Sequence, residues 1–195
     1  KTAMIKGILI VNNHGKPRLA KFYQNLTSEE EQQTVIRKVF QQVAQRPDSF
    51  CNYLEGAIPE WGDRTKIIYR HYATLYFIFA VDSQESDLGI LDLIQVFVEA
   101  LDKSFENVCE LDLIFHSDRV HYILDEIIMA GMVLETNINN ILSSVNEQNK
   151  LHSASLSSSF HGPGNTITNS YGSGNQSNDS SSIFNMTYFL SSSKK

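Results

Sequence analysis

The longest amphipathic pattern in the chain lies between residues 86 and 115. Apolar residues recur there every three or four positions, which predicts a helix over residues 86–106. Its main apolar face carries Ile90, Ile94, Phe97, Leu101 and Phe105. Four more Leu and Val residues between 91 and 98 widen this face to more than half of the helix, whereas a surface helix needs a stripe only about 100° wide. Either other helices of this chain or a partner protein must therefore cover the excess.

The N-terminal part predicts a β-hairpin followed by a helix. Residues 4–11 are almost continuously apolar, as in a strand covered on both faces, and a turn-forming Asn-Asn-His-Gly cluster follows at 12–15. Residues 16–23 read as the returning strand. Thr27 begins the capping-box pattern Thr-Ser-Glu-Glu of a helix whose apolar stripe runs from Val35 to Ala44, and Pro47 ends that helix.

Three further strands are predicted at residues 50–54, 66–69 and 73–81. In the last one, Ala73 and Leu75 lie two residues apart and should point to the same face. Both faces of this strand are apolar, which favours a central position with helices on both sides of the sheet. After the long helix we expect a bend near Asn107, a helix over residues 117–130 with Ser117 as its N-cap, and a short last helix. The order predicts an α/β (α+β) fold with an antiparallel sheet flanked by helices on both faces.

Composition divides the 195 residues into two parts. Residues 1–150 have the composition of one globular domain, and residues 151–195 form a Ser-, Asn- and Gly-rich tail that we expect to be disordered. An apolar group at residues 183–190 leaves open a short partner-binding motif in that tail. The net charge of −6 disfavours nucleic acid as a partner.

The sequence favours a reduced, cytoplasmic setting. Neither Cys51 nor Cys109 stands in a pattern that demands a disulfide, and the apolar run 75–81 is too short for the ~20 residues of a membrane span. We see no signal peptide, so the four Asn-X-Ser/Thr sequons should be idle. Met4 resembles a natural initiator methionine, and we expect residues 1–3 to be left over from an upstream segment.

Four stretches in order, residues 4–23, 66–82, 97–116 and 125–137, closely resemble the small (sigma) subunits of heterotetrameric clathrin-adaptor complexes. Within that family, residues 89–99 and 131–137 look most like the sigma subunit of adaptor complex three. The resemblance implies a longin-like fold with a five-stranded antiparallel sheet. It also implies a large delta-type partner subunit, which would cover the wide helix, together with beta- and mu-type subunits.

The resemblance further implies recognition of acidic dileucine sorting signals, [D/E]xxxL[L/I], in the cytosolic tails of membrane cargo. The positions that match the family's leucine pocket are Ala73, Leu75, Val98, Asn107, Val108 and Leu113. Arg18 matches the arginine that faces the acidic end of the signal. On the residues alone, the buried types among these are ordinary core positions and Arg18 is a solvated strand charge.

The resemblance thus implies a non-enzymatic subunit in vesicle-mediated transport from endosome or Golgi to lysosome or vacuole, peripheral on those membranes through its complex. No cofactor, metal or catalytic residue is expected, because His116 and His121 are poorly spaced for one metal and Cys109 has no activating histidine nearby in sequence. The alternatives are a coatomer zeta-type small subunit, another longin-domain trafficking regulator, or an enzyme. An enzyme should show a convergent pocket of titratable groups with perturbed pKa values.

Overall fold

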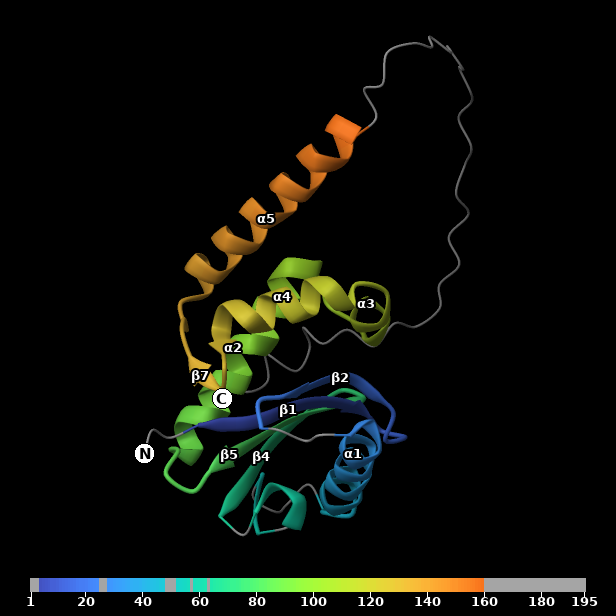
Figure 1. Cartoon of the computed structure of the whole chain (residues 1–195), viewed down its shortest axis with the longest axis vertical. Coiled ribbons are helices and arrows are strands. Elements are labelled where there is room, and N and C mark those ends of the chain that lie inside the picture. Colours follow the sequence, from blue (N-terminus) through green and yellow to red (C-terminus); the bar gives the residue numbers. More distant parts are fainter. Residues whose placement is uncertain (1–3, 25–27, 48–51, 57, 63, 160–195) are drawn as a thin grey trace.

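The computed structural model describes residues 4–24, 28–47, 52–56, 58–62 and 64–159, and side chains only as far as Leu151 within the last range. Thr27, Cys51 and the tail from residue 160 onward therefore lie outside the described residues. The described part is a five-stranded sheet between two helical layers (Figure 1).

The sheet is antiparallel throughout, with strand order β2-β1-β5-β4-β3. Its strands are β1 (Ile5–Asn12), β2 (Pro17–Phe22), β3 (Tyr53–Glu55), β4 (Thr65–Tyr72) and β5 (Leu75–Asp82). The near-continuous apolar runs of β1 and β5 are explained by their central positions, since both of their faces are buried. A 3-10 turn, Pro59–Trp61, precedes β4.

One face of the sheet carries a single helix. The helix α1 (Glu29–Ala44) lies across this face and buries Val35, Ile36, Val39 and Val43 (Figure 1). Its N-cap is Ser28, whose hydroxyl accepts a hydrogen bond from the Glu31 amide at 3.1 Å. The predicted helix is confirmed, with Ser28 as the capping residue.

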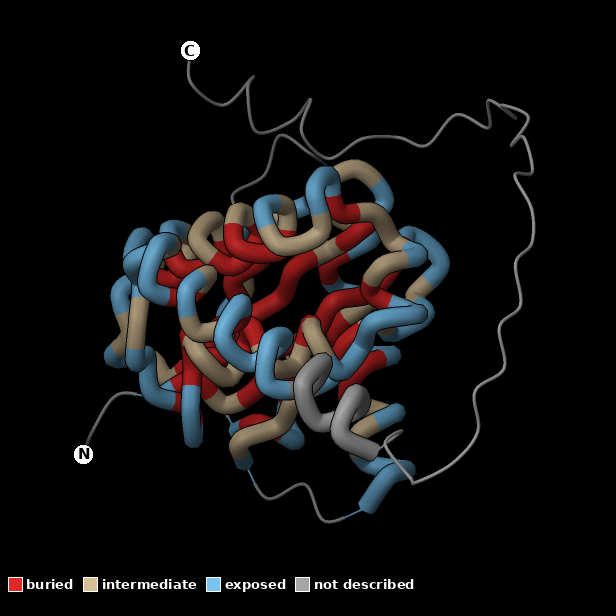
Figure 2. The backbone as a smooth tube through the Cα atoms, turned by 90° about the horizontal axis from the view of Figure 1, so that it is seen from above, coloured by how far each residue is buried: buried red, intermediate tan, exposed pale blue. Residues whose placement is uncertain are grey.

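The other face carries the remaining helices. They are α2 (Asp87–Phe105), α3 (Glu110–Phe115), α4 (Ser117–Ile127) and α5 (Ile138–Ser159). The helix α2 lies on the sheet, α4 and α5 pack against it, and the C-terminal part of α5 projects beyond the layer (Figure 1). Figure 2 shows the buried segments of both layers enclosed by exposed outer turns.

Most of the wide apolar face of α2 is covered by the chain itself. Its residues Phe97, Val98 and Leu101 are completely buried, in one cluster with Ile123 of α4 and Ile141 of α5. Leu91, Val96 and Phe105 stay partly exposed, so the chain's own helices cover most of this face but not all of it. The first turns of α5 close over α2 and bury Ile141 and Val145, and the helix, which has 22 residues and is longer than predicted, continues beyond them.

The C-terminal half differs from the prediction in two more places. Residues 110–115 form a separate helix, α3, where we expected only a bend, and His116 rather than Ser117 is the N-cap of α4. The helix α4 ends at Ile127, and a small hairpin of β6 (Ile128–Met129) and β7 (Met132–Val133) follows. Among the described residues, no helix is long and apolar enough to cross a membrane.

Candidate functional site

The apolar residues of the predicted leucine pocket lie in one cluster, but they are sealed. Leu75, Val98, Val108 and Leu113 come from β5, α2, the α2–α3 connection and α3, and each is at most 1% exposed. They are brought together by the packing of α2 and α3 on the sheet. As the chain stands alone, they are core residues, and an Asp in place of Val98 would place an unpaired charge in the core instead of only blocking a pocket.

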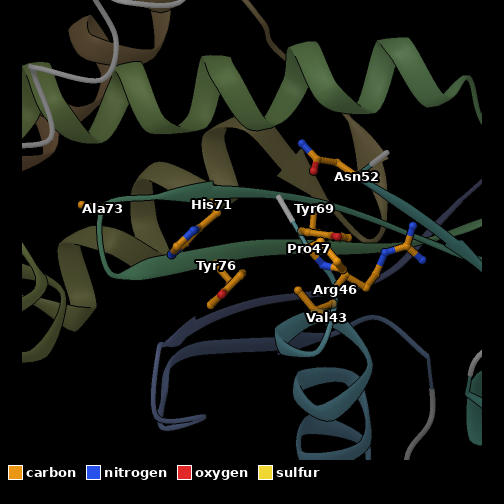
Figure 3. Close-up of a pocket in the computed structure, with 8 residues that line it drawn as sticks. All are labelled: Val43, Arg46, Pro47, Asn52, Tyr69, His71, Ala73 and Tyr76. Atoms are coloured by element: carbon orange, nitrogen blue, oxygen red, sulfur yellow. The ribbon is translucent and has the colours of Figure 1, made fainter. Parts of the chain in front are cut away.

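Ala73 does not share a face with Leu75, so that prediction is wrong. Strand β4 continues to Tyr72, and Ala73 sits in the two-residue turn to β5 with a φ of 53°. Its side chain borders a shallow cavity of about 370 Å³ on the α1 side of the sheet. Figure 3 shows Ala73 at the hairpin end of this cavity, next to His71, whereas Leu75 belongs to the cluster under α2.

Asn107 lies at the surface just after α2. Glu106 and Asn107 both have positive φ, 53° and 84°, and the Asn107 amide donates to the carbonyl of Asp102 at 3.2 Å. This left-handed pair ends the helix and turns the chain so that Val108 enters the core. Asn107 is therefore close to Val108 in the chain but exposed, whereas Val108 is buried.

Arg18 is aimed by a β-bulge and is paired inside the chain. In the β1–β2 ladder Ile10 pairs with Leu19 and Val11 with Pro17, which leaves Arg18 as the extra residue. A bulge redirects a side chain, and here the Arg18 side chain reaches Glu110 at the start of α3. The Arg18 Nε and Nη2 atoms both lie 2.7 Å from the Glu110 Oε1 atom.

Two turns hold Glu110 against Arg18. Asn12, at the end of β1, donates from Nδ2 to Glu110 Oε1 at 3.1 Å, while its own Oδ1 accepts from the His14 and Lys16 amides. Thr74, in the β4–β5 turn, has its hydroxyl 3.5 Å from Glu110 Oε2. The carboxylate is thus fixed between the β1–β2 turn, the β4–β5 turn and Arg18.

Sequence reasoning missed Glu110 and Asn12 as parts of this site. The turn cluster at 12–15 suggests an Asn side chain that accepts from the backbone of its own turn, and the structure has that contact. No local signal reveals Glu110, because its partners Arg18 and Asn12 are 92 and 98 residues away in sequence.

The apolar surface that remains exposed in the described residues lies away from α2's buried face. On α3, Leu111, Ile114 and Phe115 fall on one side and are exposed, with Phe115 at 74%. A second group surrounds the small hairpin and consists of Met129, Met132, Val133 and Leu134. Next to it, Val133 and Thr136 border a groove whose other wall is the first turns of α2.

Titratable groups with shifted pKa values are scattered through the described residues. Burial, together with the nearby Asp125 charge, raises the pKa of Tyr23, and burial raises the pKa of Tyr72. A hydrogen bond from Lys38 lowers the pKa of Glu60, and backbone amides lower that of Glu135. These residues lie on different elements and do not converge. No group of three His, Cys, Asp or Glu side chains in this part of the chain could hold a metal ion.

Residues 4–152 match the family model described as "Clathrin adaptor complex small chain". The chain is 64% identical over 148 residues to human AP-3 complex subunit sigma-2, which covers 76% of each chain. It is also 64% identical over 153 residues to the AP-3 complex subunit sigma of Dictyostelium discoideum, covering 77% of this chain and 89% of that protein. The Arabidopsis thaliana AP-3 complex subunit sigma is 48% identical over 157 residues, 80% of this chain and 93% of that one.

A structural neighbour agrees with these relatives. It is a chain from a structure described as a "Homology model of the full-length AP-3 complex in a stretched open conformation", with a TM-score of 0.61 and 42% identity over 80% of this chain and 99% of that chain. Its fold and the observed order of strands and helices confirm the predicted fold class. The chain belongs to the clathrin adaptor complex small-chain family, as a sigma subunit of the AP-3 type.

Proposed function

We propose that this chain is the sigma subunit of an AP-3-type heterotetramer with delta-, beta- and mu-type partners. Its role is to stabilise the complex in vesicle-mediated transport from endosome or Golgi toward lysosome or vacuole. It acts in the cytoplasm, peripheral on those membranes through its complex. The observation that carries this proposal is the 64% identity with proteins named as AP-3 complex subunits, over nearly all of the described residues.

The exposed apolar residues indicate where a large partner would sit. Most of the exposed large apolar residues of the described chain belong to two groups, the stripe on α3 and the residues around the β6–β7 hairpin. Removing apolar surface from water stabilises an interface by about 25 cal/mol per Å². We therefore assign the delta-type subunit to these two surfaces and not to the face of α2 that the chain already covers.

A pull-down of the tagged full chain from cells, with quantitative mass spectrometry, tests this proposal. Delta-, beta- and mu-type subunits should be recovered in equal amounts. The substitutions Phe115→Asp and Leu134→Asp should lower their recovery several-fold, since each puts a charge on a proposed contact surface. Leu151→Asp, in the C-terminal half of α5 and 69% exposed, is the matched control and should change nothing. Recovery of the chain without these partners would contradict the proposal.

Within this complex, the sigma subunit helps to bind acidic dileucine signals. Burial of two leucines contributes about 3–6 kcal/mol, and a charged hydrogen bond from Arg18 about 1.5–3 kcal/mol. Ordering a cargo tail costs several kcal/mol, so the affinity should be on the order of micromolar. What supports this site is the contiguous cluster of Leu75, Val98, Val108 and Leu113.

The sealed state of that cluster adds a requirement. Because these four side chains are at most 1% exposed, a leucine pair can enter only after a neighbour moves. The helix α3 is short, and Leu113 is its buried residue, so we propose that an outward shift of α3 opens the cluster. A dileucine peptide should bind the assembled complex, and replacement of both leucines by alanine should abolish binding. Equal binding of the two peptides would contradict this site.

A further inference from the structure

The charge of Arg18 is already balanced within the chain. Its guanidinium donates a hydrogen bond from Nε to Glu110 Oε1, Nη2 lies 2.7 Å from the same oxygen, and the two side chains are only 13% and 28% exposed. Water screens such a pair less than it screens fully exposed charges. A carboxylate arriving from outside therefore meets a neutral pair and not an isolated cation.

The geometry leaves a second edge of the guanidinium for an external acceptor. Arginine has five N–H donors in a planar fork; those of the Nε–Nη2 edge are directed at Glu110. A second carboxylate would have to use the remaining edge, formed by Nη1 and Nη2, and it would then lie beside a like charge. Glu110 cannot easily move aside, since Asn12 and Thr74 contact its two oxygens.

We propose that Glu110 is a specificity-determining counter-charge that restrains Arg18 from binding the acidic residue of a sorting signal. Its negative charge weakens the contact between Arg18 and a cargo carboxylate. Signals are then retained only when their leucine pair also binds well. This inference rests on the proposed recognition of acidic dileucine signals, and it adds a residue whose removal should strengthen that recognition.

The same strand provides a matched control. Lys21 of β2 pairs with Asp125 of α4 at 2.7 Å, with side chains 29% and 41% exposed. This pair also joins β2 to a helix, but it does not involve Arg18. Glu110→Gln and Asp125→Asn each remove one negative charge and keep a side-chain oxygen as acceptor. Any effect of net charge or of loosened helix packing should appear in both variants, whereas an effect through Arg18 should appear only in the first.

The test is peptide binding to the assembled heterotetramer, measured by fluorescence anisotropy. Two peptides are used that differ in one residue: Glu or Gln, four positions before a Leu-Leu pair. Glu110→Gln should tighten binding of the Glu peptide about tenfold, because like charges side by side disfavour binding, and should change binding of the Gln peptide less than twofold. Asp125→Asn should leave both affinities unchanged. Glu110→Ala serves as a second variant, and thermal melting verifies that each variant is folded.

Each outcome decides between the alternatives. The inference is supported if Glu110→Gln tightens binding of the Glu peptide but not of the Gln peptide. It is also supported if the wild-type complex does not bind the Glu peptide and the Glu110→Gln complex does. If wild type binds the Glu peptide and Glu110→Gln weakens it, Glu110 positions Arg18 for binding and the inference is wrong, while the proposed function stands. The same holds if Glu110→Gln leaves the Glu/Gln preference unchanged. If neither wild type nor variant binds either peptide, both the proposed recognition and the inference are wrong.

Discussion

The two faces of the sheet are covered in different ways. On one face, α1 alone buries four aliphatic residues, and Phe40 and Tyr76 at its rim are only partly buried. On the other face, α2 is enclosed by the sheet, α4 and α5, and the cluster there is about twice as large. A one-helix face is predictable from a single amphipathic stripe. A face built from several helices depends on how those helices pack on one another, and the apolar stripe of one helix does not predict that packing.

A comparison of two phenylalanines is the strongest test of this difference. Phe97 of α2 is completely buried and packs edge-on against Phe77, with ring centroids 6.1 Å apart. Phe97→Ala should lower the free energy of unfolding by about 3–5 kcal/mol, through lost burial and the cavity left behind. Phe40 of α1 is half-buried, so Phe40→Ala should cost about half as much or less. Urea denaturation of both variants measures the two losses, and equal losses would refute the difference between the faces.

Two glycines give a smaller effect of the same kind. Gly131, in the β6–β7 turn, has a φ of 79°, and a Cβ there would lie 2.5 Å from the Ile5 carbonyl oxygen. Gly15, in the β1–β2 turn, has a φ of 80°, but its Cβ would meet the ring of Phe40, which can shift. Both alanine variants carry a left-handed strain of order 1 kcal/mol. Gly131→Ala should cost about 1–2 kcal/mol more, because backbone must move.

Thermal melting compares the two glycine variants. A double variant, Gly15→Ala with Phe40→Ala, removes the ring that the new Cβ would meet and is the control. In that background, Gly15→Ala should cost only its backbone strain. An equal loss for Gly15→Ala and Gly131→Ala would show that contact with backbone or with a side chain makes no difference here.

The sequence predicted the parts of the molecule that local patterns encode. The strands β1 and β5 follow from apolar runs, and α1 from its stripe and its serine cap. The prediction failed where a tight turn or the packing of separate segments decides the structure. Ala73 was assigned to a strand because it continues the alternation of Leu75 and Phe77, yet it lies in the two-residue turn between β4 and β5 and has a positive φ.

The candidate site shows the same limit. The resemblance identified Arg18 and four residues that do form one cluster, but not that the cluster is closed. One of the four, Leu113, lies on α3, whose six residues are too few for a helical period to be recognised in the sequence. The partner of Arg18 was missed for a related reason: an ion pair between β2 and α3 has no signature in either segment.

On the α2 side of the sheet, the start of α5 depends on a titratable group. This helix completes the cover of α2. The Glu135 carboxylate accepts hydrogen bonds from the Thr136 and Asn137 amides and from Asn140 Nδ2, at 2.8–2.9 Å. The Asn137 amide, the Asn140 side chain and the Thr136 amide, in that order, lower the pKa of Glu135. A lowered folded-state pKa means that this stabilisation is complete above the ordinary pKa of Glu, about 4.3, and is lost as the pH falls through the folded value.

We therefore expect acid to loosen the start of α5 more than the start of α1. The first turn of α1 is capped by the Ser28 hydroxyl, which does not titrate in this range. Amide hydrogen exchange below pH 4, corrected for the intrinsic pH dependence, should show a larger loss of protection at Asn137 than at Glu31. Glu135→Gln removes the titration and should make protection at Asn137 independent of pH. Parallel loss of protection at both amides would mean that acid acts on the whole fold, and that the cover of α2 is no weaker at its edge than the single helix on the opposite face.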